Sequence, residues 1–507
     1  MASRTLSKSK YLAGLRCPLL LWTLANDAAS LPPVSPTTQH RFDEGNAVGH
    51  FAKKLFPDGV DVPTDNFIAN IRMTGKLIRD RRPIFEAGIL SGRLYSRADI
   101  LNPVENNAWD IYEVKSSTSI KETNIHDVAF QKRVYQQADI KINRCWLIYI
   151  DTDYVKYGEV DPAGLFRVED ISGLVEDATV GLDERIRKML AIIDCRIRPE
   201  QPLGDYCILP WECDLKPACW EELPKNHIFE LNGSLAQKAC YYQQGIISIK
   251  DIDDEAILTR KQAIQKECTV TGTSYSDQAE LGRFLANVTY PACYLEIKTI
   301  RSAIPIYDGT RPYQPIPFQF SVHSVSQPGS SPVHHSFLAD GNSDPRPQFA
   351  EKLSQSLGHD GSIIVCDSRS KARILEELAS AFPRYQKWVG SITGRLIDLL
   401  SPFENFFYYH ASQKNEVSLE SVIGAIRLEG GQNVTAPSHN QSSIAFSNMR
   451  SNTLTAEEKE AIRQILKTGC KRETLAMIEI IDRLKDMCTN VSRQHPEDSP
   501  DSSIQHH

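Results

Sequence analysis

The fold expected for this chain follows from the residues Gly92-Arg-Leu-Tyr-Ser-Arg-Ala-Asp99-Ile-Leu-Asn-Pro-Val-Glu-Asn-Asn-Ala-Trp-Asp-Ile-Tyr-Glu113-Val-Lys115. Residues 95–101 and 109–114 are short runs rich in apolar and aromatic side chains, and a turn-forming Asn-Pro-Val-Glu-Asn-Asn sequence separates them. This pattern predicts a β-hairpin. Because residues i and i+2 of a strand point to the same face, Glu113 and Lys115 project together, and Asp99 joins them if its strand is the neighbour.

Two carboxylates and an ammonium group at one spot indicate a metal-dependent hydrolytic site. Asp99 and Glu113 would supply hard oxygen ligands, which suit Mg²⁺ or Mn²⁺. Such an ion activates water and offsets charge on a phosphate, while Lys115 would orient the water or stabilise the developing charge. A helix is expected to start near Asp127, and it would carry the Gln131 and Tyr135 side chains on one face. A lone Glu-Val-Lys is also typical of a solvated edge strand, so the order of all three elements is what favours a catalytic site.

An acid followed by Glu-x-Lys and then Gln-x-x-x-Tyr resembles the arrangement of RecB-type PD-(D/E)XK nucleases. The resemblance implies a deoxyribonuclease with Asp99, Glu113, Lys115, Gln131 and Tyr135 as its catalytic residues, of which Asp99 and Glu113 bind the metal. These nucleases often place a histidine ligand on an upstream helix. A helix is expected here over residues 41–55, and its candidate ligand is His50, although a lone helical histidine is also typical of a structural position.

Cys207, Cys213 and Cys219 are evenly spaced, with proline and tryptophan between them, in a loop-rich segment able to wrap a soft metal centre. Together with Cys17 far upstream, they resemble the iron–sulfur RecB-family nucleases, which include CRISPR-associated adaptation exonucleases and AddB-type helicase–nucleases. By that resemblance the four thiolates hold a [4Fe–4S] cluster that clamps the two ends of the nuclease domain together. Tetrahedral zinc is an alternative, although its sites usually contain Cys-x-x-Cys pairs. Simple burial of the thiols as small hydrophobic groups is another.

From Tyr290 onward the chain resembles DnaQ-like exonucleases of the RNase H type. Glu296 and Lys298 stand where such domains carry Asp and Glu, Lys371 stands at the second acidic position, and Glu473 lies in a segment that lacks the last tyrosine and aspartate. Asp398 is retained. Two lysines place positive charge where cations should bind, so two-metal catalysis is not expected there. The domain is expected either to contact phosphates or to serve packing alone.

The whole chain resembles a bacterial two-domain family of uncharacterised function that joins a RecB-like half to a DnaQ-like half. The expected fold class is α/β, with a restriction-endonuclease-like PD-(D/E)XK domain over residues 1–225 and an RNase H-like domain over residues 287–488. A small helical connector is expected over residues 226–286, and a disordered polar tail over residues 489–507.

Composition restricts the setting of the protein. The formal charge of −7 gives no global attraction to nucleic acid, although basic residues between positions 115 and 144 can form a local cationic groove. Twelve cysteines without the pattern of a disulfide scaffold predict a reducing compartment. No apolar run approaches the ~20 residues of a membrane span, and the apolar run 17–25 is short for a signal peptide. A cytoplasmic protein without a membrane partner is therefore expected.

These patterns predict metal-dependent hydrolysis of phosphodiester bonds in DNA by the N-terminal site, with the C-terminal domain as a binding or structural module. A non-catalytic nucleic-acid-binding protein is the main alternative. An iron–sulfur protein whose redox state alters DNA binding, without cleavage, is a third interpretation.

Overall fold

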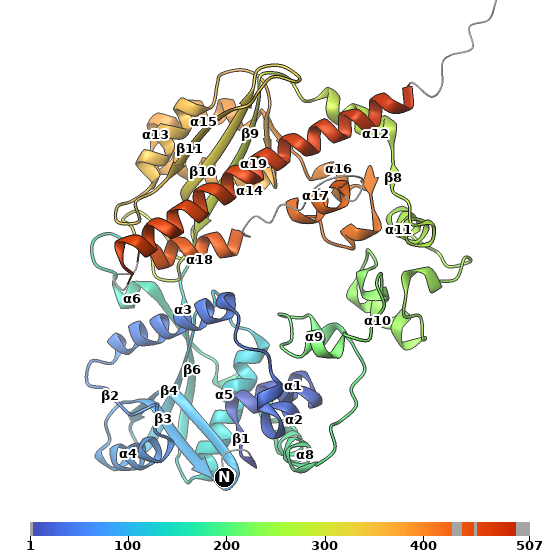
Figure 1. Ribbon diagram of the computed structural model, residues 1–507. Helices are drawn as coiled ribbons and strands as arrows, with labels where there is room; N and C mark the ends of the chain where they lie inside the picture. The colour runs from blue at the N-terminus through green and yellow to red at the C-terminus, as the bar shows by residue number, and fades with distance from the viewer. Residues whose placement is uncertain (1–3, 428–438, 451–453, 493–507) are drawn as a thin grey trace, which may run out of the picture. The chain divides into compact units, whose positions relative to one another are not determined.

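The computed structural model describes residues 4–427, 439–450 and 454–492 of this mixed α/β protein (Figure 1). The chain divides into two compact units. Unit 1 comprises Met1–Glu222 and Arg301–Gln314, and unit 2 comprises Leu223–Ile300 and Pro315–His507. Residues 226–286, expected as a separate connector, thus group with the second unit, and a short later segment returns to the first. Within the described ranges, no helix is both long enough and apolar enough to cross a membrane.

Unit 1 is built on a seven-stranded sheet in the order β2-β3-β4-β5-β6-β7, with β1 beside β4. Strands β3, β4 and β5 are antiparallel neighbours, which confirms the predicted hairpin, and β6 lies parallel to β5. The strands are β1 (Leu6–Ser7), β2 (Val60–Asp61), β3 (Ile84–Ser91), β4 (Leu94–Val104), β5 (Ala108–Lys115), β6 (Ile142–Ile150) and β7 (Phe166–Asp170).

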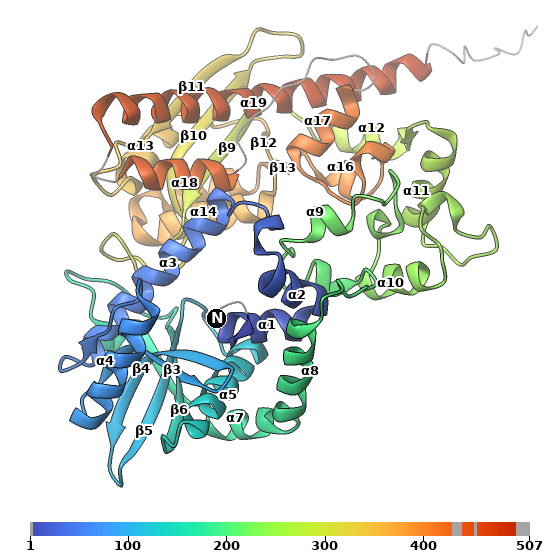
Figure 2. The same ribbon diagram turned by 60° about the horizontal axis from the view of Figure 1, so that its bottom comes forward.

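The helices of unit 1 connect and cover this sheet. Because two parallel strands need a crossover, helix α5 (Glu122–Gln137) lies between β5 and β6 in the chain, and it begins five residues before Asp127, where a helix was expected. Figure 2 shows α5 beside α1 and α7. The other α-helices of the unit are, in chain order, α1 (Lys8–Arg16), α2 (Pro18–Asn26), α3 (Pro36–Ala52), α4 (Phe67–Asp80), α6 (Pro162–Leu165), α7 (Ser172–Thr179), α8 (Leu182–Asp194) and α9 (Lys216–Cys219).

Helix α3 starts earlier than the sequence pattern indicated. The helix was expected over residues 41–55, but it begins at Pro36 and ends at Ala52, followed by a 3₁₀ turn over Lys53–Leu55. The reason is local, because the Ser35 side chain accepts a hydrogen bond from the Thr38 backbone N–H and proline suits the first helical position.

The core of unit 1 fixes α1 and α5 against the sheet. The Tyr11 ring of α1 stacks on the Phe130 ring of α5, with centroids 4.6 Å apart, and both side chains are fully buried. Buried side chains of β3 to β6, including Ala98 and Ile111, pack on the same cluster. This packing brings the start of α1 to the middle of the sheet, where the candidate site lies.

Unit 2 contains a five-stranded sheet in the order β11-β10-β9-β12-β13. Strands β9, β10 and β11 are antiparallel, whereas β12 is parallel to both β9 and β13. The strands are β9 (Ala292–Ile300), β10 (Ile316–Val325), β11 (Val333–Leu338), β12 (Ile363–Val365) and β13 (Leu396–Asp398); β8 (Tyr275–Ser276) and β14 (Tyr408–Tyr409) form a separate pair.

Strand β9 is buried on both faces, and its alternation decides which residues meet which helices. Cys293, Leu295 and Ile297 pack with α13 (Arg346–Ser356) and α14 (Ser368–Ala381). Tyr294 packs with the long helix α19 (Ala456–Ser492) on the other face. With a period of two, Glu296 and Lys298 share the face of Tyr294.

Helix α19 runs to Ser492, beyond residue 488, where the second domain was expected to end. Residues 493–507, most of the expected tail, lie outside the described part of the chain. The other helices of unit 2 are α10 (Leu235–Gln243), α11 (Arg260–Thr271), α12 (Gln278–Ala286), α15 (Gln386–Thr393), α16 (Ser401–Glu404), α17 (Leu419–Arg427) and α18 (His439–Met449).

Candidate catalytic cluster and cysteine pocket

The hairpin of β4 and β5 brings the first two predicted carboxylates to neighbouring strands. Ile100 pairs with Tyr112 at this end of the ladder, and Asp99 and Glu113 are the next residues on their respective strands. The Asp99 carboxylate accepts a hydrogen bond from the Val114 backbone N–H at 2.7 Å. This hydrogen bond uses a backbone N–H at the end of the β4–β5 ladder, and it holds the Asp99 carboxylate beside β5.

Lys115 and Gln131 join Glu113 to α5. Lys115 Nζ donates to Glu113 Oε1 at 2.5 Å and to Asp127 Oδ2 at 2.8 Å. Gln131 Nε2 donates to Glu113 Oε2 at 2.6 Å and to Asp127 Oδ1 at 3.1 Å. The Glu113 and Asp127 side chains are each only 1% exposed, so these donors compensate two buried carboxylates.

Two members of the cluster, Asp127 and Lys8, were not predicted as site residues. Asp127 precedes Gln131 by four residues, so its place on the same helix face was readable from the sequence. Lys8 Nζ lies 2.8 Å from Glu113 Oε1 and 3.6 Å from Asp127 Oδ1, although 105 residues separate Lys8 from Glu113. Lys8 is the first residue of α1, directly after the pairing of β1 with β4, and no local pattern marks it.

Tyr135 and His50 stand apart from the ion pairs. The fully buried Tyr135 hydroxyl donates to the Ala87 carbonyl of β3 and accepts from the Ala98 N–H of β4 at 3.2 Å. Tyr135 therefore braces the strand that carries Asp99, and its proton is engaged by Ala87 rather than offered to a phosphate. His50 is exposed near the end of α3 and makes none of the hydrogen bonds or ion pairs that join this cluster in the described residues.

Burial and nearby charges shift the pKa values of Asp99 and Glu113 in opposite directions. Burial, reinforced by the negative charge of Glu113, raises the pKa of Asp99 to about 7. Burial also tends to raise the pKa of Glu113, but the nearby Lys115 and Lys8 ammonium groups outweigh it and hold that pKa well below its ordinary value. The pKa of Lys8 rises despite burial, because Asp127 and Glu113 attract its charge. Three carboxylates thus face two ammonium groups, which leaves one negative charge uncompensated when Asp99 is ionised.

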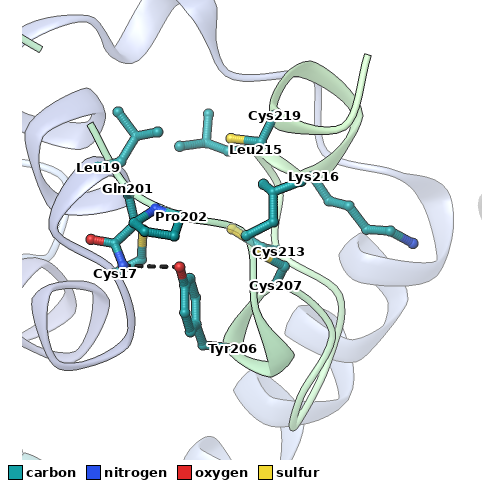
Figure 3. Close-up of a pocket in the computed structure, with 11 residues that line it drawn as sticks. Cys17, Leu19, Gln201, Pro202, Tyr206, Cys207, Cys213, Leu215, Lys216 and Cys219 are labelled. Atoms are coloured by element: carbon teal, nitrogen blue, oxygen red, sulfur yellow. Dashed lines mark hydrogen bonds between the residues drawn. The ribbon is translucent and has the colours of Figure 1, made fainter. Parts of the chain in front are cut away.

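The four predicted cysteines line one pocket of unit 1, and Figure 3 shows their sulfur atoms around a common space. Cys17 precedes α2, Cys207 ends a 3₁₀ turn, Cys213 lies in the following loop, and Cys219 ends α9. The Cys213 N–H donates to the Cys207 carbonyl at 2.9 Å and closes the loop between them. Burial raises the pKa of the Cys17, Cys213 and Cys219 thiols.

The pocket has a donor set of four thiols and an otherwise largely apolar lining that includes Leu19, Pro202 and Leu215. Arg16 joins its two sides, because Nε donates to the Tyr206 carbonyl at 2.7 Å and Nη2 donates to the Trp211 carbonyl. In the described residues no group of three or more His, Cys, Asp or Glu side chains is arranged to hold a single metal ion.

A second charged cluster lies inside unit 2, at the positions predicted to have lost their acids. Lys371 Nζ donates to Glu296 Oε1 at 2.9 Å, and Lys298 Nζ donates to Glu473 Oε1 at 2.7 Å. Lys298 also lies 3.6 Å from Glu296. All four side chains are at most 10% exposed, and burial raises the pKa of Glu473 to about 7. The ammonium groups occupy the space between the carboxylates.

Asp398, the acid retained in unit 2, is held by backbone donors. Its carboxylate accepts hydrogen bonds from the Ser368 N–H at 2.7 Å and from the Leu400 N–H at 3.1 Å. Asp398 thus ties the end of β13 to the start of α14.

Comparison with known proteins gives little further information. Residues 293–418 match the model of a domain of unknown function (DUF2779). No curated protein matches the sequence. One similar solved structure, titled "Crystal structure of SSO0001", is 14% identical and covers 39% of this chain and 88% of its own, with a TM-score of 0.16.

Tyr135→Phe is expected to destabilise unit 1, because it leaves the buried Ala98 N–H and Ala87 carbonyl without their partner. The expected loss is about 1–3 kcal/mol in the free energy of unfolding, measured by urea denaturation. Tyr157→Phe, at a side chain that is 74% exposed, serves as the control and should change stability by no more than about 0.5 kcal/mol. Equal stability of both variants would contradict the bracing role.

Lys298→Met is expected to destabilise unit 2 by about 3–5 kcal/mol, because Glu473 would remain buried without its ammonium partner. The double variant Lys298→Met/Glu473→Leu should recover much of that loss, since both charges are removed. Lys352→Met, at an exposed lysine, is the control. A single variant as stable as the parent would show that the buried pairs do not hold this unit together.

Proposed function

We propose that this chain is a metal-dependent deoxyribonuclease of the PD-(D/E)XK type whose active site is the cluster in unit 1. The observation that carries the proposal is the convergence of Asp99, Glu113 and Lys115 from two neighbouring strands on one spot. Strand order supports it, because an antiparallel β3-β4-β5 meander is followed by a crossover helix and a parallel strand. The arrangement agrees with the RecB-like resemblance of the motifs.

Asp99 and Glu113 would hold Mg²⁺ or Mn²⁺, and their oxygen donors with one uncompensated negative charge fit such a hard cation. When bound, the cation would activate water and offset charge on the phosphate. Glu113 accepts hydrogen bonds from the ammonium groups of Lys8 and Lys115. Lys115 would orient the attacking water or contact the phosphate, and Lys8 would supply a second positive charge.

For the cysteine pocket, we propose a [4Fe–4S] cluster held by Cys17, Cys207, Cys213 and Cys219. Four thiols around one largely apolar space fit that group, and it would have a structural role. The cluster would join the start of α2 to the loop between residues 207 and 219. Zinc is the less favoured alternative, because the described side chains include no group of three or more such ligands arranged around a single ion.

For unit 2, we propose an RNase H-like domain that acts as a binding or structural module. Its mixed sheet, with three antiparallel strands and two parallel ones, agrees with the DnaQ-like resemblance of the sequence. Lys298 and Lys371 neutralise Glu473 and Glu296. A metal cation is therefore not expected to bind there, because both carboxylates are already paired with ammonium groups.

A non-catalytic nucleic-acid-binding protein is favoured by one observation, namely that ammonium groups also neutralise Glu113 in unit 1. A cleavage assay separates the two functions. Anaerobically purified protein is incubated with single- and double-stranded DNA and Mg²⁺ or Mn²⁺. We expect the parent to cleave and Lys115→Ala to lose about 10²-fold or more in rate. Lys188→Ala, at a lysine that is 72% exposed, should match the parent.

Two results would contradict the proposal. Equal cleavage by the parent and Lys115→Ala would place the activity outside this site. Binding of DNA without cleavage by any of the proteins, under either cation, would leave the non-catalytic alternative.

Asp99→Asn is expected to abolish cleavage yet stabilise the cation-free protein at pH 8. The raised pKa of Asp99, about 7, means that ionised Asp99 destabilises the folded state at pH values above the ordinary pKa of aspartate. Asparagine keeps an oxygen acceptor for the Val114 N–H. The gain in melting temperature, measured in EDTA, should therefore be largest at pH 8, shrink at pH 5 and vanish near pH 4. A melting temperature below that of the parent at pH 8 would refute this account.

A further inference from the structure

A cavity of about 590 Å³ opens in unit 1 beside the candidate catalytic cluster, and it shares Lys115 and Asp127 with that cluster. One side consists of the connection from β5 to α5, including Ser117 and Lys121. The other side consists of α1 and the loop that follows Cys207. The volume lies in the range of ordinary ligand pockets, about 300–1,000 Å³.

The loop side of the cavity is unusually apolar for a solvent-accessible surface. Leu209 and Trp211 are each 51% exposed, and both line the cavity with Leu12 and Leu15 of α1. Large apolar side chains gathered at an accessible site indicate a binding surface. This one lies next to the residues that would perform the chemistry.

The Trp211 ring is held in place by its surroundings. The Arg16 guanidinium lies 5.8 Å from the ring centroid, and Arg16 donates to the carbonyl groups of Tyr206 and Trp211. The loop that carries Trp211 is closed by the hydrogen bond between Cys213 and Cys207. An exposed aromatic ring on a braced loop loses little conformational entropy when a planar group stacks on it.

The opposite side of the cavity supplies ammonium groups and hydrogen-bond donors. Lys115 and Lys121 carry ammonium groups, Glu122 and Asp127 carry carboxylates, and Ser117 and Thr123 carry hydroxyl groups. With Arg16 of α1, the lining has three cationic and two anionic side chains. Aromatic side chains together with basic groups are the combination that binds single-stranded nucleic acid, because bases stack on the rings while phosphates meet the charges. A base inside a duplex already has both faces stacked, so it cannot reach Trp211.

We propose that this cavity binds an unpaired nucleotide of single-stranded DNA, with its base against Trp211 and Leu209 and its phosphate toward Lys115. The inference rests on the proposed nuclease function and adds a substrate class to it. The loop between Cys207 and Cys213 thereby forms a wall of the substrate site as well as part of the cysteine pocket.

Equilibrium binding without cleavage tests this proposal. Fluorescein-labelled oligothymidylate and a duplex of equal length are titrated with the full chain in EDTA, and anisotropy is measured. The parent should bind the single strand more tightly than the duplex. Trp211→Ala should weaken single-strand binding by about 5- to 150-fold and leave duplex binding unchanged. Trp211→Phe should stay within about 3-fold of the parent, because it keeps an aromatic ring.

Tyr157→Ala, at an exposed aromatic residue of unit 1 outside the cavity, is the matched control and should bind like the parent. Leu209→Ser changes the same wall and replaces Trp211→Ala if that variant does not fold; it too should weaken single-strand binding alone. Parental binding by the folded variant, or equal loss for single strand and duplex, overturns the proposal.

The two proposals fail separately. Single-strand binding that depends on Trp211, without cleavage under Mg²⁺ or Mn²⁺, retains the cavity assignment and rejects the nuclease. Cation-dependent cleavage that requires Lys115, with an unchanged KM for single strands in Trp211→Ala, retains the nuclease and rejects the cavity assignment.

Discussion

The buried carboxylate of Glu113 is the point on which unit 1 depends. Its side chain is 1% exposed, and it accepts hydrogen bonds from Lys8, Lys115 and Gln131. A buried charge without partners costs several kcal/mol, so these three donors must be in place together. They belong to α1, β5 and α5, and the stacking of Tyr11 on Phe130 holds the two helices in the required positions.

The charged clusters of the two units use the same groups but differ in access. In unit 1 the Lys8 and Lys115 side chains are 23% and 27% exposed, and Lys115 borders an open cavity. In unit 2 the Lys298 and Lys371 side chains are only 4% and 9% exposed. An ammonium group near solvent can leave its carboxylate for a phosphate, because water solvates it on the way, whereas an enclosed one would lose its only compensation. The first cluster is therefore suited to exchange partners, and the second to stability.

The cysteine pocket and the cavity share the loop between Cys207 and Cys213. Cys207 and Cys213 face the pocket, while Leu209 and Trp211, which lie between them in the chain, line the cavity. A group bound by the thiols would hold both ends of this loop and limit its motion. Arg16 adds a second restraint from α1, directly beside Cys17. The position of the apolar wall thus depends on the same residues that surround the thiols.

Local residue patterns were enough to predict the hairpin and the face shared by Glu113 and Lys115, because strand alternation is a property of neighbouring residues. They also predicted that Gln131 and Tyr135 lie on one side of a helix, since helical spacing is equally local. Long-range packing, in contrast, brings Lys8 to Glu113 from 105 positions away and directs the Tyr135 hydroxyl to Ala87. Only the tertiary structure placed Trp211 beside the cluster. Such contacts depend on how β1, α1 and the cysteine loop pack against distant parts of the chain, and no short sequence pattern encodes that packing.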